Sequence, residues 1–388
     1  MRTISTSKDP LHVLLTTDLV GGVWDFCRVL AGEFARIGHR VSLLAFGVPT
    51  VVQRAEAAAV GAKLLDAPLK LEWMQASADD VDTTRTLTAG LVRDLRPDIL
   101  HVNQFAPARL DVDIPIVLTA HSDVLSWLKW TERGGRDGPV PIEWSRYATL
   151  VRQGVQSADA VVAVSCFMAN QMAELYDRQG ELAVVYNGWP EGTDDPRPTI
   201  ERERLTVLAG RAWDSAKNLE LATRAAGDRG LGRIVHAGDR QHPESGSLRD
   251  LGPAVVALGR LSPEQLDRYL GSARVYLAPA RYEPFGLLPL QAALAGCPLL
   301  LSDIPSFREL WDGVALFFRS DDASDLRAQW RRLLDDDRLA TELATRARRR
   351  AQERYTPSRM ASEYVSVYRR LLTERGARVQ TNRRRSMA

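Results

Sequence analysis

The feature that most constrains the fold is a series of short apolar segments, each followed by a turn and a stretch with helical spacing of apolar residues. After the first segment, Phe26, Leu30 and Phe34 recur at that spacing until Gly38. Six segments in the first half have the length and apolar character of buried parallel strands: HVLLTT (12–17), RVSLLAF (40–46), PDILHVN (97–103), PIVLTAH (115–121), AVVAVS (160–165) and LAVVYNG (182–188). Strands that alternate with helices predict a parallel sheet with helices on both faces.

The same alternation begins again in the second half, after a segment rich in Pro, Asp and Gly at residues 189–202. The second set of segments comprises LTVLAG (205–210), GRIVHAG (232–238), AVVALG (254–259), ARVYLAP (273–279), PLLLSD (298–303) and VALFF (314–318). Because 388 residues exceed one compact core, we expect two doubly wound α/β domains. The expected boundaries are residues 1–190, residues 191–356, a C-terminal helix at 357–375 that could fold back on the first domain, and a mobile tail at 376–388.

The composition excludes several classes of protein. With 45% hydrophobic residues, 26% charged residues and a formal net charge of +2, the chain lacks the basic excess of a nucleic-acid-binding domain. Its three cysteines are far apart and have no metal-ligand spacing, which favours a reducing compartment. The N-terminus resembles neither a signal peptide nor a membrane span. We therefore expect a cytoplasmic protein.

Two candidate features follow strands of the first half, at the strand ends where open α/β sheets bind ligands. In DLVGGVW (18–24), the glycines Gly21 and Gly22 would let the backbone approach an anion at a helix start, or would simply make a tight turn. His121 ends the fourth segment. Its imidazole could donate a hydrogen bond to a sugar hydroxyl or to developing charge, although most single histidines are structural.

Two further features belong to the second half. In AGRAWDSAKN (209–218), Arg211 and Lys217 are the two cations of a loop near a helix start, suited to phosphate oxygens or else solvated on the surface. In RYEPFGLLPLQAALAGC (281–297), Glu283 precedes a helix whose first amides, around Phe285 to Leu287, could hold hydroxyl or phosphate groups. Gly286 would permit that approach, and the alternative is a carboxylate that only stabilises the helix dipole.

Two weaker patterns carry less information. The acidic triplets at 80–82 and 111–113 follow no convincing strand, and we expect no metal site there. The aromatic segment Trp127 to Trp144 could line an acceptor pocket or rest on a membrane, but a packed surface loop is favoured because its charges offset one another.

Taken together, these motifs resemble the retaining GT-B glycosyltransferases of the family-4 type, also called glycosyltransferases group 1. The resemblance covers nearly the whole chain and includes the Gly-Gly turn, the R…K loop, Y-E-P-F-G-L followed by A-x-A-G, D-I-P-S-F-R-E-L (303–310) and Y-T-P-S-R-M (355–360). It implies a GT-B fold of two facing Rossmann-like domains. It also implies metal-independent hexosyl transfer from a nucleotide-sugar donor to a hydroxyl of a glycan, a lipid-linked sugar or a small metabolite, without a cofactor.

The resemblance also assigns roles to residues. It implies that Arg211 and Lys217 neutralise the diphosphate leaving group, and that Glu283 contacts the donor sugar together with the amides of residues 285–287. His121 would lie near the reaction centre, and Gly21 and Gly22 beside the diphosphate. The second carboxylate of the family's E-x7-E pattern is replaced here by Gln291. An amide can still hold the ribose hydroxyls, but we expect it to weaken donor binding by ~1 kcal/mol because charge-assisted hydrogen bonds are stronger.

Two other functions remain open from the residues alone. One is a nucleotide-sugar epimerase or hydrolase on the same fold, although no acid/base pair for such chemistry stands out. The other is a degenerate GT-B protein that only binds or scaffolds a partner. For the enzyme, polysaccharide biosynthesis is the expected process, and peripheral contact with the inner face of the membrane is left open because many relatives have it.

Overall fold

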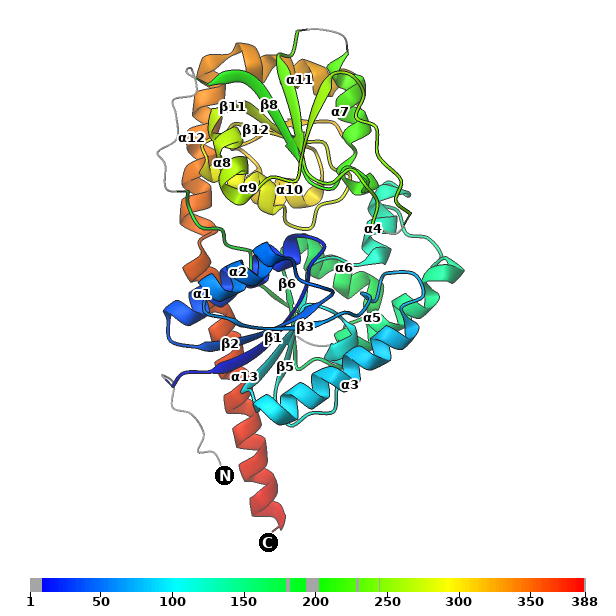
Figure 1. The fold of residues 1–388 in the computed structure, drawn as a ribbon, viewed down its shortest axis with the longest axis vertical. Helices are drawn as coiled ribbons and strands as arrows, with labels where there is room; N and C mark the ends of the chain where they lie inside the picture. Colours follow the sequence, from blue (N-terminus) through cyan, green and yellow to red (C-terminus); the bar gives the residue numbers. More distant parts are fainter. Residues whose placement is uncertain (1–8, 179–181, 193–201, 228–229, 244, 387–388) are drawn as a thin grey trace. The chain divides into compact units, whose positions relative to one another are not determined.

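A computed structural model describes residues 9–178, 182–192, 202–227, 230–243 and 245–386 of the chain, with side chains described up to residue 377. Its contacts divide the chain into two compact units (Figure 1). Unit 1 combines Met1–Ser126, Pro139–Gly188 and Pro357–Ala388, and unit 2 combines Trp127–Gly138 and Trp189–Thr356. Most of the segment expected to link the domains, residues 193–201, lies outside the described residues.

Unit 1 contains a seven-stranded parallel sheet in the order β3-β2-β1-β4-β5-β6-β7. Its strands are β1 (His12–Asp18), β2 (Arg40–Phe46), β3 (Lys63–Ala67), β4 (Ile99–Val102), β5 (Ile116–Ala120), β6 (Ala160–Ala163) and β7 (Leu182–Val184). The central strands β1, β4, β5 and β6 are almost completely buried, as their apolar composition predicts. Strand β3 was not predicted, because KLLDA lies at the sheet edge and keeps two exposed polar residues.

Most helices of unit 1 lie between successive strands of its sheet in the chain. They are α1 (Gly22–Arg36), α2 (Val51–Ala59), α3 (Ala78–Leu95), α4 (Val124–Thr131), α5 (Ser145–Ser157), α6 (Cys166–Tyr176) and α13 (Pro357–Ser386), with short 3-10 turns η1 (Ala106–Ala108) and η2 (Ile142–Trp144). Helix α4 begins in unit 1, but its residues from Trp127 onward group with unit 2. The segment interpreted as a packed surface loop therefore contains the greater part of a helix.

Helix α13 is part of unit 1 although it follows the last residue of unit 2 in the chain. Tyr364 and Tyr368 on this helix are fully buried against Phe26 and Phe34 of α1, with ring centroids 5.8 and 5.7 Å apart for the two pairs. The C-terminal helix thus packs on the first domain, as expected. It continues to Ser386, through most of the segment for which a mobile tail was predicted; residues 387–388 lie outside the described residues.

Unit 2 contains a six-stranded parallel sheet in the order β10-β9-β8-β11-β12-β13. The strands are β8 (Glu203–Ala209), β9 (Arg233–Ala237), β10 (Val255–Gly259), β11 (Ala273–Ala278), β12 (Leu299–Ser302) and β13 (Leu316–Phe318). The helical elements are η4 (Ser215–Lys217), α7 (Leu219–Ala226), α8 (Pro263–Ser272), α9 (Leu287–Leu294), α10 (Pro305–Trp311), α11 (Ala323–Asp335) and α12 (Asp337–Arg354). Trp330 of α11 is fully buried and donates through Nε1 to Thr206 Oγ1 of β8 at 2.8 Å.

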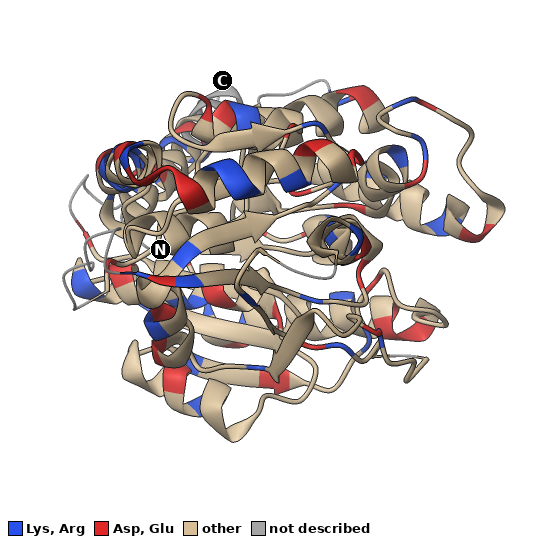
Figure 2. Cartoon of the chain, turned by 90° about the horizontal axis from the view of Figure 1, so that it is seen from above, with Lys and Arg blue, Asp and Glu red and all other residues tan. Residues whose placement is uncertain are grey.

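Both units are therefore doubly wound α/β sheets, as the alternating pattern predicts. Charged residues lie mainly on the helices and loops, whereas the strands are largely uncharged (Figure 2). In each sheet the strand order reverses beside the first strand, between β1 and β4 in unit 1 and between β8 and β11 in unit 2. Loops that leave such a reversal point diverge and leave room for a ligand at the carboxyl ends of the strands.

Candidate functional site

The polar residues predicted in the second half of the chain meet at the reversal point of unit 2. Lys217 lies at the end of η4, after β8, and Glu283 lies between the neighbouring strand β11 and helix α9. Lys217 Nζ donates to Glu283 Oε2, and each side chain is only 18% exposed. The structure therefore brings together two residues that are 66 positions apart in the chain, in a direct ion pair that the sequence analysis did not predict.

Helix α9 begins four residues after Glu283, at Leu287. Its N-cap is Gly286, whose φ of 87° lies in the left-handed region, and no side chain caps the helix. A Cβ at Gly286 would lie 3.1 Å from Pro289 Cγ and 3.2 Å from Glu283 Cγ, so a larger residue would press on these two side chains. The first two amides of α9, those of Leu287 and Leu288, have no partner within the helix, and the next residue, Pro289, has no N–H. Gln291 lies one turn further along α9 and is only 8% exposed.

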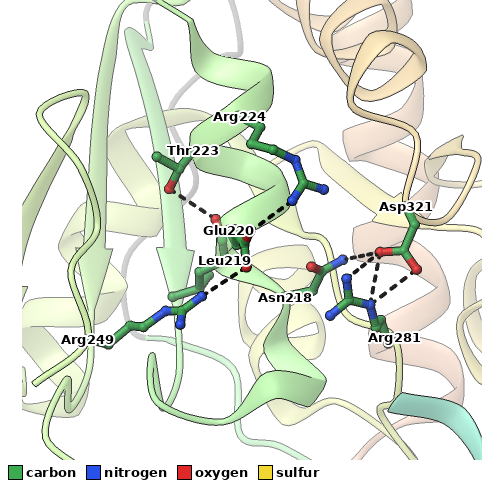
Figure 3. Close-up of polar contacts among 8 residues, drawn as sticks. All are labelled: Asn218, Leu219, Glu220, Thr223, Arg224, Arg249, Arg281 and Asp321. Atoms are coloured by element: carbon green, nitrogen blue, oxygen red, sulfur yellow. Dashed lines mark hydrogen bonds and ion pairs between the residues drawn. The ribbon is translucent and has the colours of Figure 1, made fainter. Parts of the chain in front are cut away.

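Asp321 connects the two loops that carry Lys217 and Glu283 (Figure 3). It follows β13, and its carboxylate accepts from Asn218 Nδ2 at 3.0 Å and from Arg281 Nε at 2.9 and 3.1 Å. The backbone N–H of Arg281 also donates to the carbonyl of Ala216 at 2.8 Å. Asn218, next to Lys217, and Arg281, two residues before Glu283, are thus both held by one carboxylate from a third loop.

Arg211 follows β8 and forms an ion pair with Asp214. Its Nη2 is 2.8 Å from Asp214 Oδ2, and its guanidinium lies 5.1 Å from the centre of the Trp213 ring. Burial would raise the pKa of Asp214, but the charges of Arg211 and Lys217 hold that pKa below its ordinary value. Trp127 Nε1 donates to the same carboxylate at 3.0 Å.

Asp214 and Asp321 were not among the site residues predicted from the sequence. Asp214 could have been predicted, because it lies between Arg211 and Lys217 in the sequence and a carboxylate near two cations is expected to pair with one of them. For Asp321 the sequence held no such signal, since its partners come from loops 40 and 103 residues away.

The candidate residues of the first half gather at the reversal point of unit 1. Gly21 is the N-cap of α1 and Gly22 its first residue, directly after β1, and no side chain caps this helix. The φ of Gly21 is −151°, which any residue can adopt, so the turn does not require glycine for its backbone angle.

His121 follows β5 and is half-buried, and its Nε2 lies 2.7 Å from Asn103 Oδ1. Its ring packs edge-to-face against the ring of Phe26, and the two ring centroids are 4.6 Å apart. Desolvation lowers the pKa of His121 to about 3, so the ring is neutral at physiological pH. Asn103, which follows β4, was not predicted to take part.

Among the residues that the structure describes, no three His, Cys, Asp or Glu side chains come together as a metal site. No described helix combines the length and the apolar character needed to cross a bilayer.

Comparisons with known proteins agree on one family. The chain matches the model of Glycosyltransferase Family 4 over residues 20–190 and that of Glycosyl transferases group 1 over residues 203–336. A glycogen synthase from Mycobacterium tuberculosis is 30% identical over 315 residues, which cover 74% of this chain and 72% of that protein.

Solved structures show the same fold at lower sequence identity. Sucrose-phosphate synthase from Thermosynechococcus elongatus superimposes with a TM-score of 0.75 at 17% identity, covering 94% of this chain and 100% of that one. HepE from Anabaena in complex with UDP-glucose superimposes with a TM-score of 0.70 at 13% identity, covering 92% of this chain and 99% of that one. The two parallel sheets are therefore the two domains of a GT-B fold.

Proposed function

Because the chain belongs to the family-4, or group 1, glycosyltransferases, we propose that it transfers a hexosyl group from a nucleotide-sugar donor to a hydroxyl acceptor with retention of anomeric configuration. The observation that carries this proposal is the pairing of Lys217 with Glu283 beside the uncapped start of α9. A cation, a carboxylate and unpaired helix amides within one small region suit a ligand that has both phosphate and hydroxyl groups.

In the proposed reaction, the bond between the anomeric carbon and the diphosphate oxygen breaks, and a bond from that carbon to the acceptor oxygen forms on the same face. The proton of the acceptor hydroxyl passes to the leaving phosphate. Negative charge therefore develops on the diphosphate, and preorganised cations lower the barrier to its departure. Lys217 is the first candidate for this role and Arg211 the second.

Lys217 and Glu283 neutralise one another in their ion pair, so donor binding must replace this contact. The diphosphate would take the ammonium of Lys217, and the sugar hydroxyls would donate to the carboxylate of Glu283. The first amides of α9 would then bind the same sugar or the phosphate. Gln291 would reach the nucleotide ribose through its amide.

HepE from Anabaena has been solved with UDP-glucose, and a glycogen synthase is among the relatives. Both support glucose as the first donor sugar to try, and an α-glucan or another polysaccharide as the first acceptor. We further propose that no divalent metal is needed, since Lys217 and Arg211 can supply the positive charge that a metal would otherwise bring.

The decisive experiment measures nucleotide release from UDP-, GDP- and ADP-sugars by the full chain, with and without acceptor sugars and α-glucans. Turnover with one donor, unchanged by EDTA, is expected, and NMR of the product should show the anomeric configuration of the donor. An inverted product would refute retention. Release without acceptor at the full rate would identify a hydrolase, and the absence of binding or turnover with every donor would favour a scaffold protein.

A further inference from the structure

The side chain of Asn103 lies between the ring of His121 and the backbone of strand β1. Asn103 is 8% exposed, and Thr16 and Cys27 beside it are fully buried. The Nδ2 of Asn103 donates to the carbonyl oxygen of Thr16 at 2.6 Å and lies 3.3 Å from Cys27 Sγ. Its Oδ1 is 2.7 Å from His121 Nε2.

The orientation of this amide follows from its surroundings. A backbone carbonyl can only accept hydrogen bonds, so the group 2.6 Å from the Thr16 oxygen must be the NH₂ of Asn103. Turning the amide over would place two acceptor oxygens at that distance. The backbone N–H of Asn103 also donates to Thr16 Oγ1 at 3.0 Å, which holds the residue against β1.

The amide orientation decides which nitrogen of His121 carries the proton. Because Oδ1 of Asn103 faces the ring and can only accept, Nε2 of His121 must be the N–H donor. In a neutral ring the other nitrogen, Nδ1, then has a lone pair and no hydrogen. The low pKa of His121, caused by desolvation, agrees with a neutral ring.

We propose that Asn103 is a positioning residue that holds His121 as the Nε2–H tautomer, so that Nδ1 accepts a hydrogen bond from a substrate hydroxyl. The part that concerns the substrate rests on the proposed function. In this arrangement His121 accepts a hydrogen bond from the substrate, whereas the sequence had suggested that its imidazole donates one. A site of this kind recognises a hydroxyl that can donate, and it gives no such hydrogen bond to a group that can only accept.

The first test measures the tautomer directly. The full chain is labelled with ¹⁵N-histidine, and long-range ¹H–¹⁵N correlation spectra are recorded near neutral pH. The chain has six histidines, so the His121 signals are assigned by their disappearance in His121→Gln. We expect Nε2 to show the shift of a protonated nitrogen and Nδ1 that of an unprotonated one. A protonated Nδ1 would overturn the proposal, and this result needs no variant of Asn103.

The second test asks whether Asn103 is the cause. Asn103→Leu removes the acceptor, so a measurable share of the Nδ1–H tautomer should appear. Asn103→Gln keeps both an acceptor oxygen and an NH₂ group without adding charge and serves as the control, in which the Nε2–H form should persist. A fixed Nε2–H tautomer in folded Asn103→Leu would show that another group holds the ring and would overturn the role of Asn103.

The third test concerns the substrate and uses the donor that the nucleotide-sugar panel selects. In its monodeoxyfluoro analogues, one hydroxyl at a time is replaced by fluorine, which cannot donate a hydrogen bond. At least one analogue should lower kcat/KM about fivefold or more in the wild-type protein but have no such effect in His121→Ala. Equal sensitivity in both proteins would overturn the substrate contact. Failure of every nucleotide sugar would instead refute the proposed function and leave the tautomer result standing.

Discussion

Asp321→Ala tests whether the loops of Lys217 and Glu283 act as one site. Neither of those two residues is changed by the substitution. Asp321 instead accepts hydrogen bonds from Asn218, next to Lys217, and from Arg281, two residues before Glu283 (Figure 3). Its removal should loosen the connection between the two loops, which stay linked by the Arg281–Ala216 backbone hydrogen bond and the Lys217–Glu283 ion pair, while the rest of the sheet stays intact.

The expected loss of stability comes mainly from Asn218. The side chains of Arg281 and Asp321 are 28% and 50% exposed, so their ion pair contributes at most about 1 kcal/mol. Asn218 is 4% exposed, and its Oδ1 already has no partner among the described residues. Without Asp321 its Nδ2 would also be unpaired, which costs about 1–3 kcal/mol. The free energy of unfolding should therefore fall by about 1–3 kcal/mol.

The loss of activity should be larger than the small unfolded fraction caused by this loss of stability would produce. A misplacement of the phosphate-binding and sugar-binding groups by a fraction of an ångström lowers catalytic efficiency steeply, and we expect kcat/KM to fall about tenfold or more. The assay is nucleotide release at a temperature where urea titration shows the variant to be fully folded.

Asp322→Ala is the matched control. Asp322 is the neighbouring aspartate and caps α11 by accepting from Ser324 N and Asp325 N at 3.0 and 2.9 Å. Its loss should cost about 1 kcal/mol of stability without touching either loop. If both variants keep wild-type kcat/KM, or lose it equally, the positioning role of Asp321 is wrong.

Three further predictions concern single groups. Lys217→Ala and Glu283→Ala should each abolish detectable turnover while keeping the native circular dichroism spectrum, and normal activity in either would refute the assigned roles. Gln291→Glu should strengthen donor binding about fivefold, since a charge-assisted hydrogen bond to ribose adds ~1 kcal/mol; an unchanged Kd by calorimetry would contradict the ribose contact. Desolvation raises the pKa of Glu72 to about 7, so folding favours its protonated form, and stability should fall as pH rises from about 4.5 to 7. Because the side chain is partly exposed, the loss should be about 1–3 kcal/mol, and urea titrations at pH 5 and 8 should show it in the wild-type protein but not in Glu72→Gln.

The strands were largely predictable because a parallel strand covered on both faces must be apolar along its whole length. Twelve segments were expected, and each corresponds to a strand of one of the two sheets. The thirteenth, β3, escaped because an edge strand with exposed Lys63 and Asp66 lacks that pattern. The loop residues Arg211, Lys217 and Glu283 were recognisable as candidates because charged side chains directly after buried strands lie where such sheets bind ligands.

Sequence alone thus determined two doubly wound sheets, the family and the loops that carry the chemistry, since these depend on local composition and spacing. Only the tertiary structure decided which side chains meet. Lys217 pairs with Glu283 because β8 and β11 are neighbours although 63 residues separate the end of one from the start of the other. Asn103 reaches His121 because β4 lies between β1 and β5. Strand order is set by packing over the whole sheet, and no short pattern in the chain encodes it.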